Sequence, residues 1–167
     1  EDIRMAKEIG ADINQREVKL GHGDTPFPKL EEASTLFTPL LKLWTTLADF
    51  RRSKKDWMEG PFESLVADEV EKEVQLTFDV AVKLRKDLSM FAGPSTVAMV
   101  LYDEVREFRN DVPLITALAS PALRHRHWIE IANQCGSDSF MVDEETTLLK
   151  LVDEGIKDHL DTIQSVA

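Results

Sequence analysis

The stretch PALRHRHWIEIANQCG, residues 121–136, gathers the residue types that most resemble a reactive site. Two arginines and two histidines precede Trp128 there, which allows a metal site, an anion site or a helix around a buried aromatic ring. His125 and His127 are two apart and diverge on a helix, whereas helical metal ligands lie three or four apart. We therefore interpret the segment as a structural helix with Trp128 in the core and with Arg126 and His127 hydrogen-bonded to neighbouring elements.

The other candidate sites lack essential residues. The GHGDTP segment, residues 21–26, has neither the lysine nor the preceding strand of a phosphate-binding loop. Acidic runs occupy helical positions that do not converge on one point, which is typical of a solvated face. Cys135 has no second cysteine and no spacing that pairs it with a base. Because no acid, base or nucleophile converges, the sequence predicts no catalytic, cofactor-binding or metal-binding residue.

Composition limits the partners. Of the 167 residues, 43% are hydrophobic and 31% charged, a balance typical of a globular domain. The net charge of -11 argues against direct contact with nucleic acid, an anionic membrane or the acidic surface of a microtubule. A lone cysteine fits a reducing compartment, and no apolar run is long enough to span a bilayer. Since Glu1 is not a methionine and the last residues keep a helical period, we expect a piece of a longer chain.

Apolar residues recur at helical spacing along the chain, and no useful length alternates with period two, so the fold class is all-α. The pattern predicts helices over residues 1–20 and 30–58, with Pro39 kinking or splitting the second. Breaks at residues 60–62 and 91–95 bound a third helix that should begin with a capping box at Asp68 and Glu71. A fourth helix and the short LITALA helix follow.

Two further helices complete the prediction. Ser120 and Pro121 predict the start of the helix that carries Trp128, and Gly136 its end. A final uninterrupted helix is expected from about Glu144. The stripes expected to face the core are Ile3, Ala6, Ile9 and Ile13; Phe37, Leu40, Trp44, Leu47 and Phe50; Val70, Val74, Phe78, Ala81, Leu84 and Leu88; Val97, Val100 or Leu101, Val105 and Phe108; and Leu149, Val152, Ile156, Leu160 and Ile163.

Several segments resemble one family in order and approximate spacing. They are LWTTLADFRRSKKDWMEGPFESLVADEVEKEV at 43–74, VPLITALASPALRHRHWIEI at 112–131 and TLLKLVDEGIKDHLDTIQSVA at 147–167. This order resembles N-terminal region two of the dynein heavy chain, where the tail passes into the linker. The most specific pieces are Pro113, Leu114 and Ile115, Pro121, Ala122 and Leu123, and Arg126, His127 and Trp128. A further grouping is more similar to axonemal than to cytoplasmic heavy chains: Trp57, Met58, Gly60, Pro61 and Phe62.

The resemblance implies an elongated multi-helix bundle that forms part of a helical rod, in which residues 30–167 are the linker or tail segment and residues 1–29 a helix and loop without assignment. It implies a mechanical role, with Trp44, Trp57 and Trp128 anchoring packed helices, and with ATP and Mg confined to the downstream AAA+ ring. The implied partners are that ring, the tail of the same heavy chain and other dynein chains. The implied location is the cytoskeleton of the cytoplasm, in the axoneme of a cilium or flagellum.

Two alternatives come from other functional classes. A free-standing helical scaffold could bind partner helices through its apolar stripes, and a native chain of about this length would favour it. An all-α enzyme is the other alternative, and turnover by the isolated segment would favour it.

Overall fold

The fold is helical throughout the part of the chain that the structure describes. A computed structural model describes residues 2–120, 123–135 and 146–166. Within these ranges the elements are α-helices and short 3-10 helices, and the one pairing of extended backbone is an isolated antiparallel bridge between Pro61 and Thr147. The prediction of an all-α fold is confirmed.

Unit 1, residues 1–44, consists of α1 (Asp2–Lys19) and the first half of α2 (Pro28–Glu59), which continues into unit 2. Thr25 fixes the connection, because its Oγ1 and N–H donate to the Glu17 carboxylate at 2.8 Å and 3.1 Å. Gly10 is buried and faces Phe27, where a Cβ would lie 3.2 Å from two ring atoms. The Gly10 side of α1 therefore packs at the start of α2.

The stripe predicted for α1 is buried only in part. Ile3 and Ala6 are half-buried, but Ile9 is 58% exposed and Ile13 is exposed as well. Apolar residues lie on more than one side of α1. Helical spacing alone therefore did not identify the side, marked by Gly10, that packs against the start of α2.

Helix α2 runs through Pro39 without interruption, so the expected split there is wrong. A proline removes one backbone donor and crowds the preceding turn. In a helix of 32 residues the backbone hydrogen bonds on either side of that turn are enough to keep the element continuous.

The buried face of α2 is rotated from the predicted one. Leu47 and Phe50 are buried as expected, and Leu43 is buried with them. Phe37 and Trp44 were expected to face the core, but both are exposed, Trp44 by 56%. Neighbouring apolar residues place two overlapping stripes on this helix, and the helical period fits both of them.

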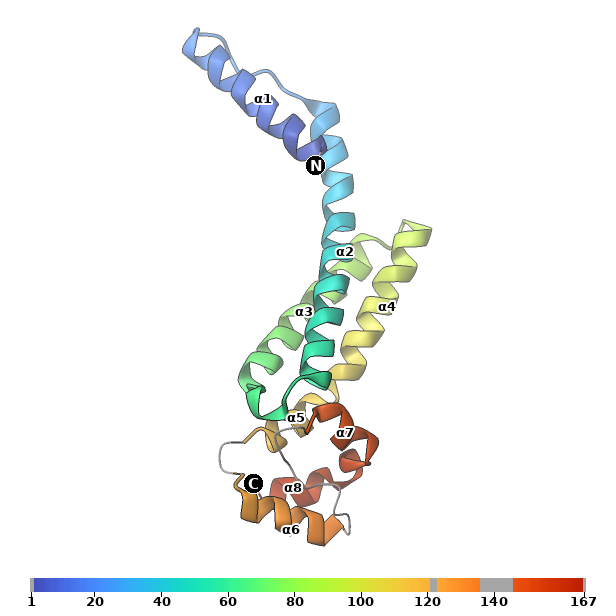
Figure 1. Cartoon of the computed structure of the whole chain (residues 1–167). Coiled ribbons are helices and arrows are strands. Elements are labelled where there is room, and N and C mark those ends of the chain that lie inside the picture. The colour runs from blue at the N-terminus through green and yellow to red at the C-terminus, as the bar shows by residue number, and fades with distance from the viewer. Residues whose placement is uncertain (1, 121–122, 136–145, 167) are drawn as a thin grey trace. The chain divides into compact units, whose positions relative to one another are not determined.

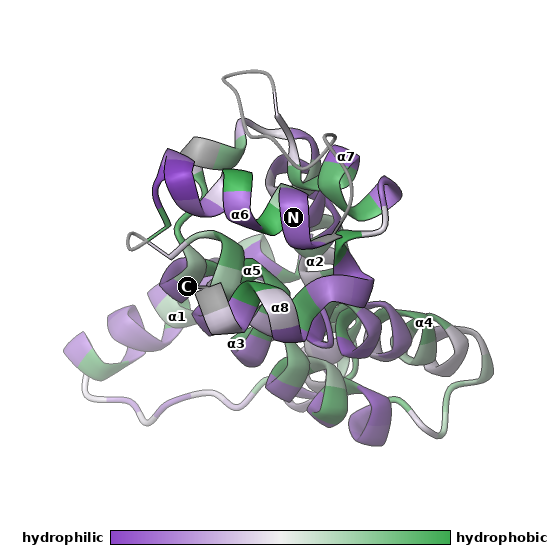
Figure 2. Cartoon of the chain, turned by 90° about the horizontal axis from the view of Figure 1, so that it is seen from below, coloured by the Kyte–Doolittle hydropathy of each residue, from purple (hydrophilic) through white to green (hydrophobic). Residues whose placement is uncertain are grey.

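Unit 2, residues 45–167, contains a three-helix bundle formed by the second half of α2, α3 (Ala67–Asp87) and α4 (Ala92–Arg109) (Figure 1). Along these ribbons hydrophobic and hydrophilic residues alternate, as amphipathic helices require (Figure 2). The predicted core stripes of α3 and α4 are largely buried. Of the two alternatives on α4, Leu101 is buried and Val100 is exposed. The buried side chains here are Val70, Val74, Ala81, Leu84, Leu88, Ala98, Leu101, Val105 and Phe108.

The predicted capping box of α3 does not form. The helix begins after Val66, which has extended backbone and makes no side-chain capping hydrogen bond. Asp68 and Glu69 therefore lie within the first turn, where their charges favour the positive end of the helix dipole. Spacing identified the acidic helix start but placed the cap two residues too late.

Short helices complete unit 2 around the end of the bundle (Figure 1). They are η1 (Phe62–Ser64), α5 (Val112–Leu118), α6 (His125–Cys135), α7 (Leu148–Asp153), η3 (Ile156–His159) and α8 (Leu160–Val166). The predicted LITALA helix is confirmed as α5. Helix α6 starts at His125, and Ser120 is not helical, so the predicted start is four residues early. Pro121 and Gly136 lie outside the described residues.

The final helix is interrupted, contrary to the prediction. Helix α7 ends at Asp153, and Gly155 adopts a left-handed conformation with φ +86° before η3 begins. Glycine reaches this conformation without the steric cost that a Cβ imposes, so it ends the helix where periodicity predicted continuation. Ile156 and Ile163 are still buried as predicted, whereas Leu149 is exposed and Leu148 takes the core position.

Candidate functional site

The described residues hold no group of three or more His, Cys, Asp or Glu side chains that could bind a metal ion. His125 is exposed at the first position of α6, so it does not converge with His127. Nor is any helix among the described residues long and apolar enough to cross a membrane. The contacts that join the helices of unit 2 lie in a packed core, which is the candidate site.

Trp128 lies in that core, as the sequence predicts. It is 7% exposed on the face of α6 that also buries Ile131 and Ala132. Its ring contacts Phe62 of η1 edge to face, with centroids 6.0 Å apart. This aromatic contact holds α6 against the connection between α2 and α3.

His127 and Arg126 act within their own helix and not on neighbouring elements as expected. The backbone N–H of Arg124, just before α6, donates to His127 Nδ1 at 3.1 Å. His127 is the third residue of α6 and thus fills the role of the returning side chain in a capping box. The exposed Arg126 donates from Nε to His127 Nε2 at 3.0 Å. A neutral imidazole has one acceptor nitrogen, so His127 accepts only one of these two hydrogen bonds at a time, depending on which ring nitrogen carries the proton.

Phe108 of α4 is the centre of an aromatic cluster that joins two helices. Phe50 of α2 meets its ring edge to face at 6.1 Å, and Trp57 of α2 stacks on it at 5.4 Å. Lys54 places Nζ 5.6 Å from the centroid of the same ring. Because Phe108 is only 1% exposed, its ring has partners on several sides and fixes α2 against α4.

An ion pair with two hydrogen bonds also joins α2 to α4. Arg51 of α2 donates to Glu104 of α4 through Nε at 3.1 Å and a terminal nitrogen at 2.6 Å. This hydrogen-bonded guanidinium lowers the pKa of Glu104 below its usual value, although partial burial acts in the opposite direction. The carboxylate in turn raises the pKa of Arg51. Ser53 Oγ donates to Glu73 of α3 at 2.6 Å, so α2 is tied to both other helices of the bundle.

Backbone and side-chain bonds join the short helices to the bundle. The Phe62 N–H donates to the Thr146 carbonyl at 3.0 Å, next to the bridge between Pro61 and Thr147. Lys157 of η3 pairs with Asp111, which follows α4, at 2.8 Å. These contacts attach the elements after residue 145 to the turns at the end of the bundle.

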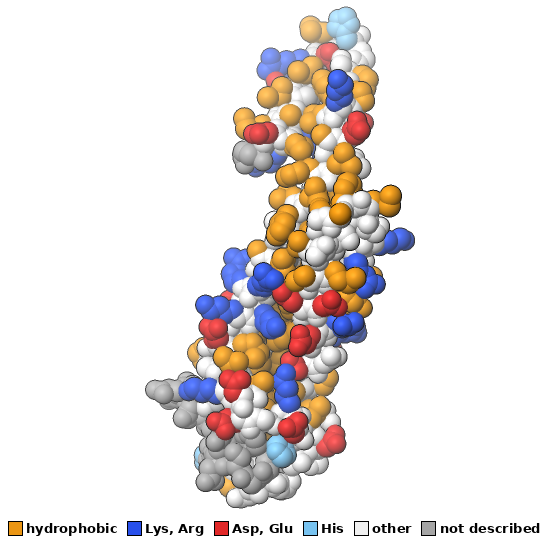
Figure 3. Space-filling view, turned by 90° about the vertical axis from the view of Figure 1, so that its right-hand side faces the viewer, with side chains coloured by type: hydrophobic (Ala, Val, Ile, Leu, Met, Phe, Trp, Pro, Cys, Tyr) orange, Lys and Arg blue, Asp and Glu red, His pale blue; other side chains and the backbone are white. Residues whose placement is uncertain are grey.

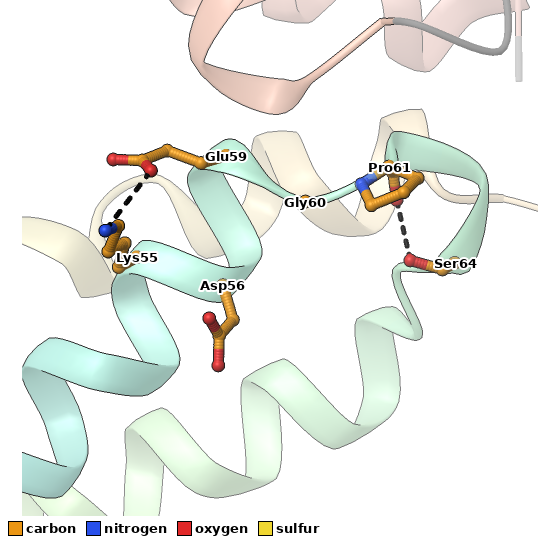
Figure 4. Close-up of a pocket in the computed structure, with 6 residues that line it drawn as sticks. All are labelled: Lys55, Asp56, Glu59, Gly60, Pro61 and Ser64. Carbon is orange, nitrogen blue, oxygen red and sulfur yellow. Dashed lines mark hydrogen bonds and ion pairs between the residues drawn. The ribbon is translucent and has the colours of Figure 1, made fainter.

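The turn after α2 is shaped by a glycine. A Cβ at Gly60 would lie 2.4 Å from the Asp56 carbonyl oxygen, so no larger residue fits without a backbone shift. A surface hollow beside this turn is lined by Lys55, Asp56, Glu59, Gly60, Pro61 and Ser64 (Figure 4).

The side chains that line this hollow mainly interact with one another. Lys55 pairs with Glu59 at 3.8 Å, and Ser64 Oγ donates to the Pro61 carbonyl at 2.7 Å. Asp56 points away from that ion pair (Figure 4). The arrangement suits a fixed turn and brings no base to the Ser64 hydroxyl.

The other predicted motif residues occupy different surroundings. Leu114 is buried in α5, and Pro113 is exposed at the start of that helix, where a missing N–H costs nothing. Trp57 is half-buried on Phe108, whereas Trp44 is exposed. The Arg51–Glu104 pair was not predicted, because its partners are far apart in the chain and have many charged neighbours.

Comparison with known proteins identifies the family. The family described as "Dynein heavy chain, N-terminal region 2" matches residues 30–167. The chain belongs to this family. The resemblance seen in the sequence is thus confirmed.

Relatives of this chain include axonemal dynein heavy chains. Dynein axonemal heavy chain 1 of Mus musculus is 28% identical over 165 residues, which are 99% of this chain and 4% of that protein. Dynein axonemal heavy chain 3 of Mus musculus is 24% identical over 154 residues, 92% of this chain and 4% of that protein. The Chlamydomonas reinhardtii dynein-1-beta heavy chain, flagellar inner arm I1 complex, is 23% identical over 99% of this chain and 4% of its own length. The chain thus spans a small part of the heavy chains that it matches.

Proposed function

We propose that this chain is a stiff helical segment in the tail-to-linker region of an axonemal dynein heavy chain. In this role it transmits movement between the AAA+ ring and the tail, and so couples ATP hydrolysis to microtubule-based movement of a cilium or flagellum. The observation that carries the proposal is the cross-bracing of α2, against α4 by the Phe108 cluster and the Arg51–Glu104 pair and against α3 by the Ser53–Glu73 hydrogen bond. A segment that transmits force needs such contacts because close-packed side chains resist deformation.

The proposal assigns no catalysis to this segment. ATP and Mg belong to the downstream ring, and the ring and the tail are the partners of the segment. A net charge of -11 disfavours direct contact with the acidic microtubule surface, nucleic acid or anionic membranes. The location that follows is the axoneme, within the cytoskeleton. Calorimetry with the purified segment should detect no micromolar ATP binding.

The test uses the whole motor and weakens the brace without removing a helix. Phe108→Ala empties the centre of the cluster, and Trp44→Ala removes a comparably large side chain that is exposed. We expect Phe108→Ala to retain ATPase activity but to lower gliding velocity at a given ATPase rate, and Trp44→Ala to change neither. Normal gliding by a Phe108→Ala motor whose bundle is measurably destabilised would refute the proposal.

The free-standing scaffold is the second candidate, and the exposed apolar side chains of unit 1 favour it (Figure 3). On α2 they are Leu36, Phe37, Leu41 and Trp44. A scaffold of this kind would be made as a short polypeptide, whereas a heavy-chain segment would not. The mass of the native polypeptide, detected with an antibody against this segment, therefore separates the two candidates.

A further inference from the structure

Two aromatic rings and two arginines on α3 and α4 contact one another in the order Arg109, Phe78, Tyr102 and Arg85. The Phe78 and Tyr102 rings lie 5.4 Å apart and join the two helices. The Arg85 guanidinium lies 4.1 Å from the centroid of Tyr102, and that of Arg109 lies 4.7 Å from the centroid of Phe78. Arg106 adds a third guanidinium 5.5 Å from Tyr102. We call these five residues the arginine–aromatic face.

The arginine–aromatic face is turned away from α2. On α4 the contacts with α2 come from Glu104 and Phe108, and helical spacing puts Tyr102 and Arg106 roughly 120° to 160° around the helix from both, whereas Arg109 lies about 100° from Phe108. The contact of α3 with Ser53 of α2 likewise comes from Glu73, opposite Phe78. The three arginines are exposed and the two aromatic rings half-buried, so this face is open to a partner.

Apolar side chains extend the same face. Val82 is four residues after Phe78 on α3 and is 40% exposed, and Met99 is three residues before Tyr102 on α4 and is 48% exposed. The surface thus combines apolar side chains with a row of arginines. This combination fits an amphipathic helix whose apolar side is bordered by carboxylates.

The charge of the face contrasts with the charge of the chain. Arg106 pairs with Asp103 at 3.3 Å, but neither Arg85 nor Arg109 forms an ion pair with a carboxylate among the described residues. The whole chain carries a net charge of -11. Each of these guanidinium groups lies over an aromatic ring, and a contact of this kind uses none of its N–H groups as hydrogen-bond donors, so a carboxylate can accept two of them.

We propose that the arginine–aromatic face docks an acidic amphipathic helix from another part of the same heavy chain. The expected weakness of this contact favours a helix from the same polypeptide over a separate partner. Exposed charge pairs are weak and screened by salt, so a patch of this size binds a free partner poorly. A tethered helix is present at an effective concentration of about millimolar, which makes a weak contact sufficient. The chain matches only 4% of the length of its relatives, so most of such a heavy chain is available to supply the helix.

The inference depends on the chain being part of a heavy chain and not on the force-transmitting role. A motor whose brace proves irrelevant to gliding would leave the docking test intact, and a failed docking test would leave the coupling of ATPase to gliding unaffected.

The experiment places a photoreactive benzophenone side chain at Met99 in the full-length heavy chain and identifies the cross-linked peptides by mass spectrometry. We expect one dominant peptide from elsewhere in the heavy chain, with acidic and apolar residues at helical spacing. The double variant Arg85→Glu with Arg109→Glu should reduce that cross-link at least tenfold, and high salt should reduce it as well.

A matched control makes the same charge change on α3 away from the arginine–aromatic face. Lys72→Glu with Lys83→Glu should keep the cross-link, since both lysines are exposed and lie on another side of the helix. Thermal unfolding of both double variants checks that the bundle is intact. The proposal is overturned by a cross-link to a different polypeptide, by no cross-link, or by one that survives charge reversal in a folded protein.

Discussion

Units 1 and 2 have similar apolar patterns in the sequence but bury them to very different extents. In unit 1, Ile9 and Trp44 belong to helical stripes and are yet 58% and 56% exposed. In unit 2, Phe50 and Phe108 belong to similar stripes and are each 1% exposed. The difference lies in the number of packing partners, because an apolar stripe is buried only where other helices cover it. Helical periodicity therefore predicts an amphipathic helix but not whether its apolar face is covered.

The largest effect should come from removing the centre of the unit 2 brace. Phe108→Ala should destabilise unit 2 by about 4 to 5 kcal/mol, since it empties a site packed by Phe50 and Trp57. Trp44→Ala in unit 1 should change stability by no more than about 0.5 kcal/mol, as is typical of exposed positions. Urea denaturation of the 167-residue chain measures both. Comparable losses in the two variants would remove the contrast between the units.

The second effect tests whether the short helices share the tight packing of the bundle. Trp128→Ala should cost about 3 to 4 kcal/mol, because it removes a buried ring that contacts Phe62. His125→Ala, at the exposed first position of α6, should cost at most about 0.5 kcal/mol. The midpoints of denaturant curves followed by Trp fluorescence and by circular dichroism supply the comparison. Small and equal shifts would show that α6 contributes little to the core.

A smaller effect concerns the break between α7 and η3. Gly155→Ala should cost about 1 to 2 kcal/mol because an L residue is disfavoured at φ +86° even though no atom crowds the new Cβ. Gly93→Ala in α4 is the control, since Gly93 has no positive φ and no atom beyond its chain neighbours crowds the new Cβ; because Pro94 follows it, we expect a change of at most about 0.5 kcal/mol. Thermal unfolding distinguishes them, and losses of equal size would argue against a backbone cause.

The smallest effect is electrostatic and depends on pH. Glu104→Gln should cost about 0.5 to 1 kcal/mol at neutral pH, since the Arg51–Glu104 pair is partly exposed. The pKa of Glu104 is lowered in the folded chain, so its contribution is complete above the ordinary glutamate pKa and is lost as pH falls through the folded value.

The stability difference between wild type and Glu104→Gln should therefore shrink on acidification. Urea curves recorded from neutral pH down to below the ordinary glutamate pKa test this. Glu107→Gln is the control on the same helix and should change stability at neutral pH by no more than about 0.5 kcal/mol. A difference that grows toward acid would contradict the assigned direction.

Local patterns in the sequence predicted most of the helices and much of the unit 2 core. The stripe Val70, Val74, Ala81 and Leu84 is buried as predicted, because α3 and α4 pack on each other and each has one clear apolar side. Prediction failed where one residue changes the backbone, as at Gly155, and where two apolar stripes overlap, as around Trp44. In both places the deciding factor is a backbone angle or a packing partner that the helical period does not report.

The candidate site was predicted less completely. Trp128 follows from a local pattern, but the Arg51–Glu104 pair and the stacked arginines Arg85 and Arg109 do not. These contacts join residues on different helices, and nothing in a single sequence specifies which of many charged residues face one another. The use of His127 as a helix cap was also missed, although its place three residues after Arg124 is the spacing of a capping box.

The bond between Phe62 and Thr146 also constrains how the chain folds. The α3–α4 hairpin closes a short loop, whereas this bond closes one that includes most of unit 2, and the entropy lost on closing a loop rises with its length. We therefore expect the hairpin to form first and the bridge at Pro61 and Thr147 last. During synthesis on the ribosome, the turn after α2 must then wait for residues 146 and 147 to emerge before it can pair.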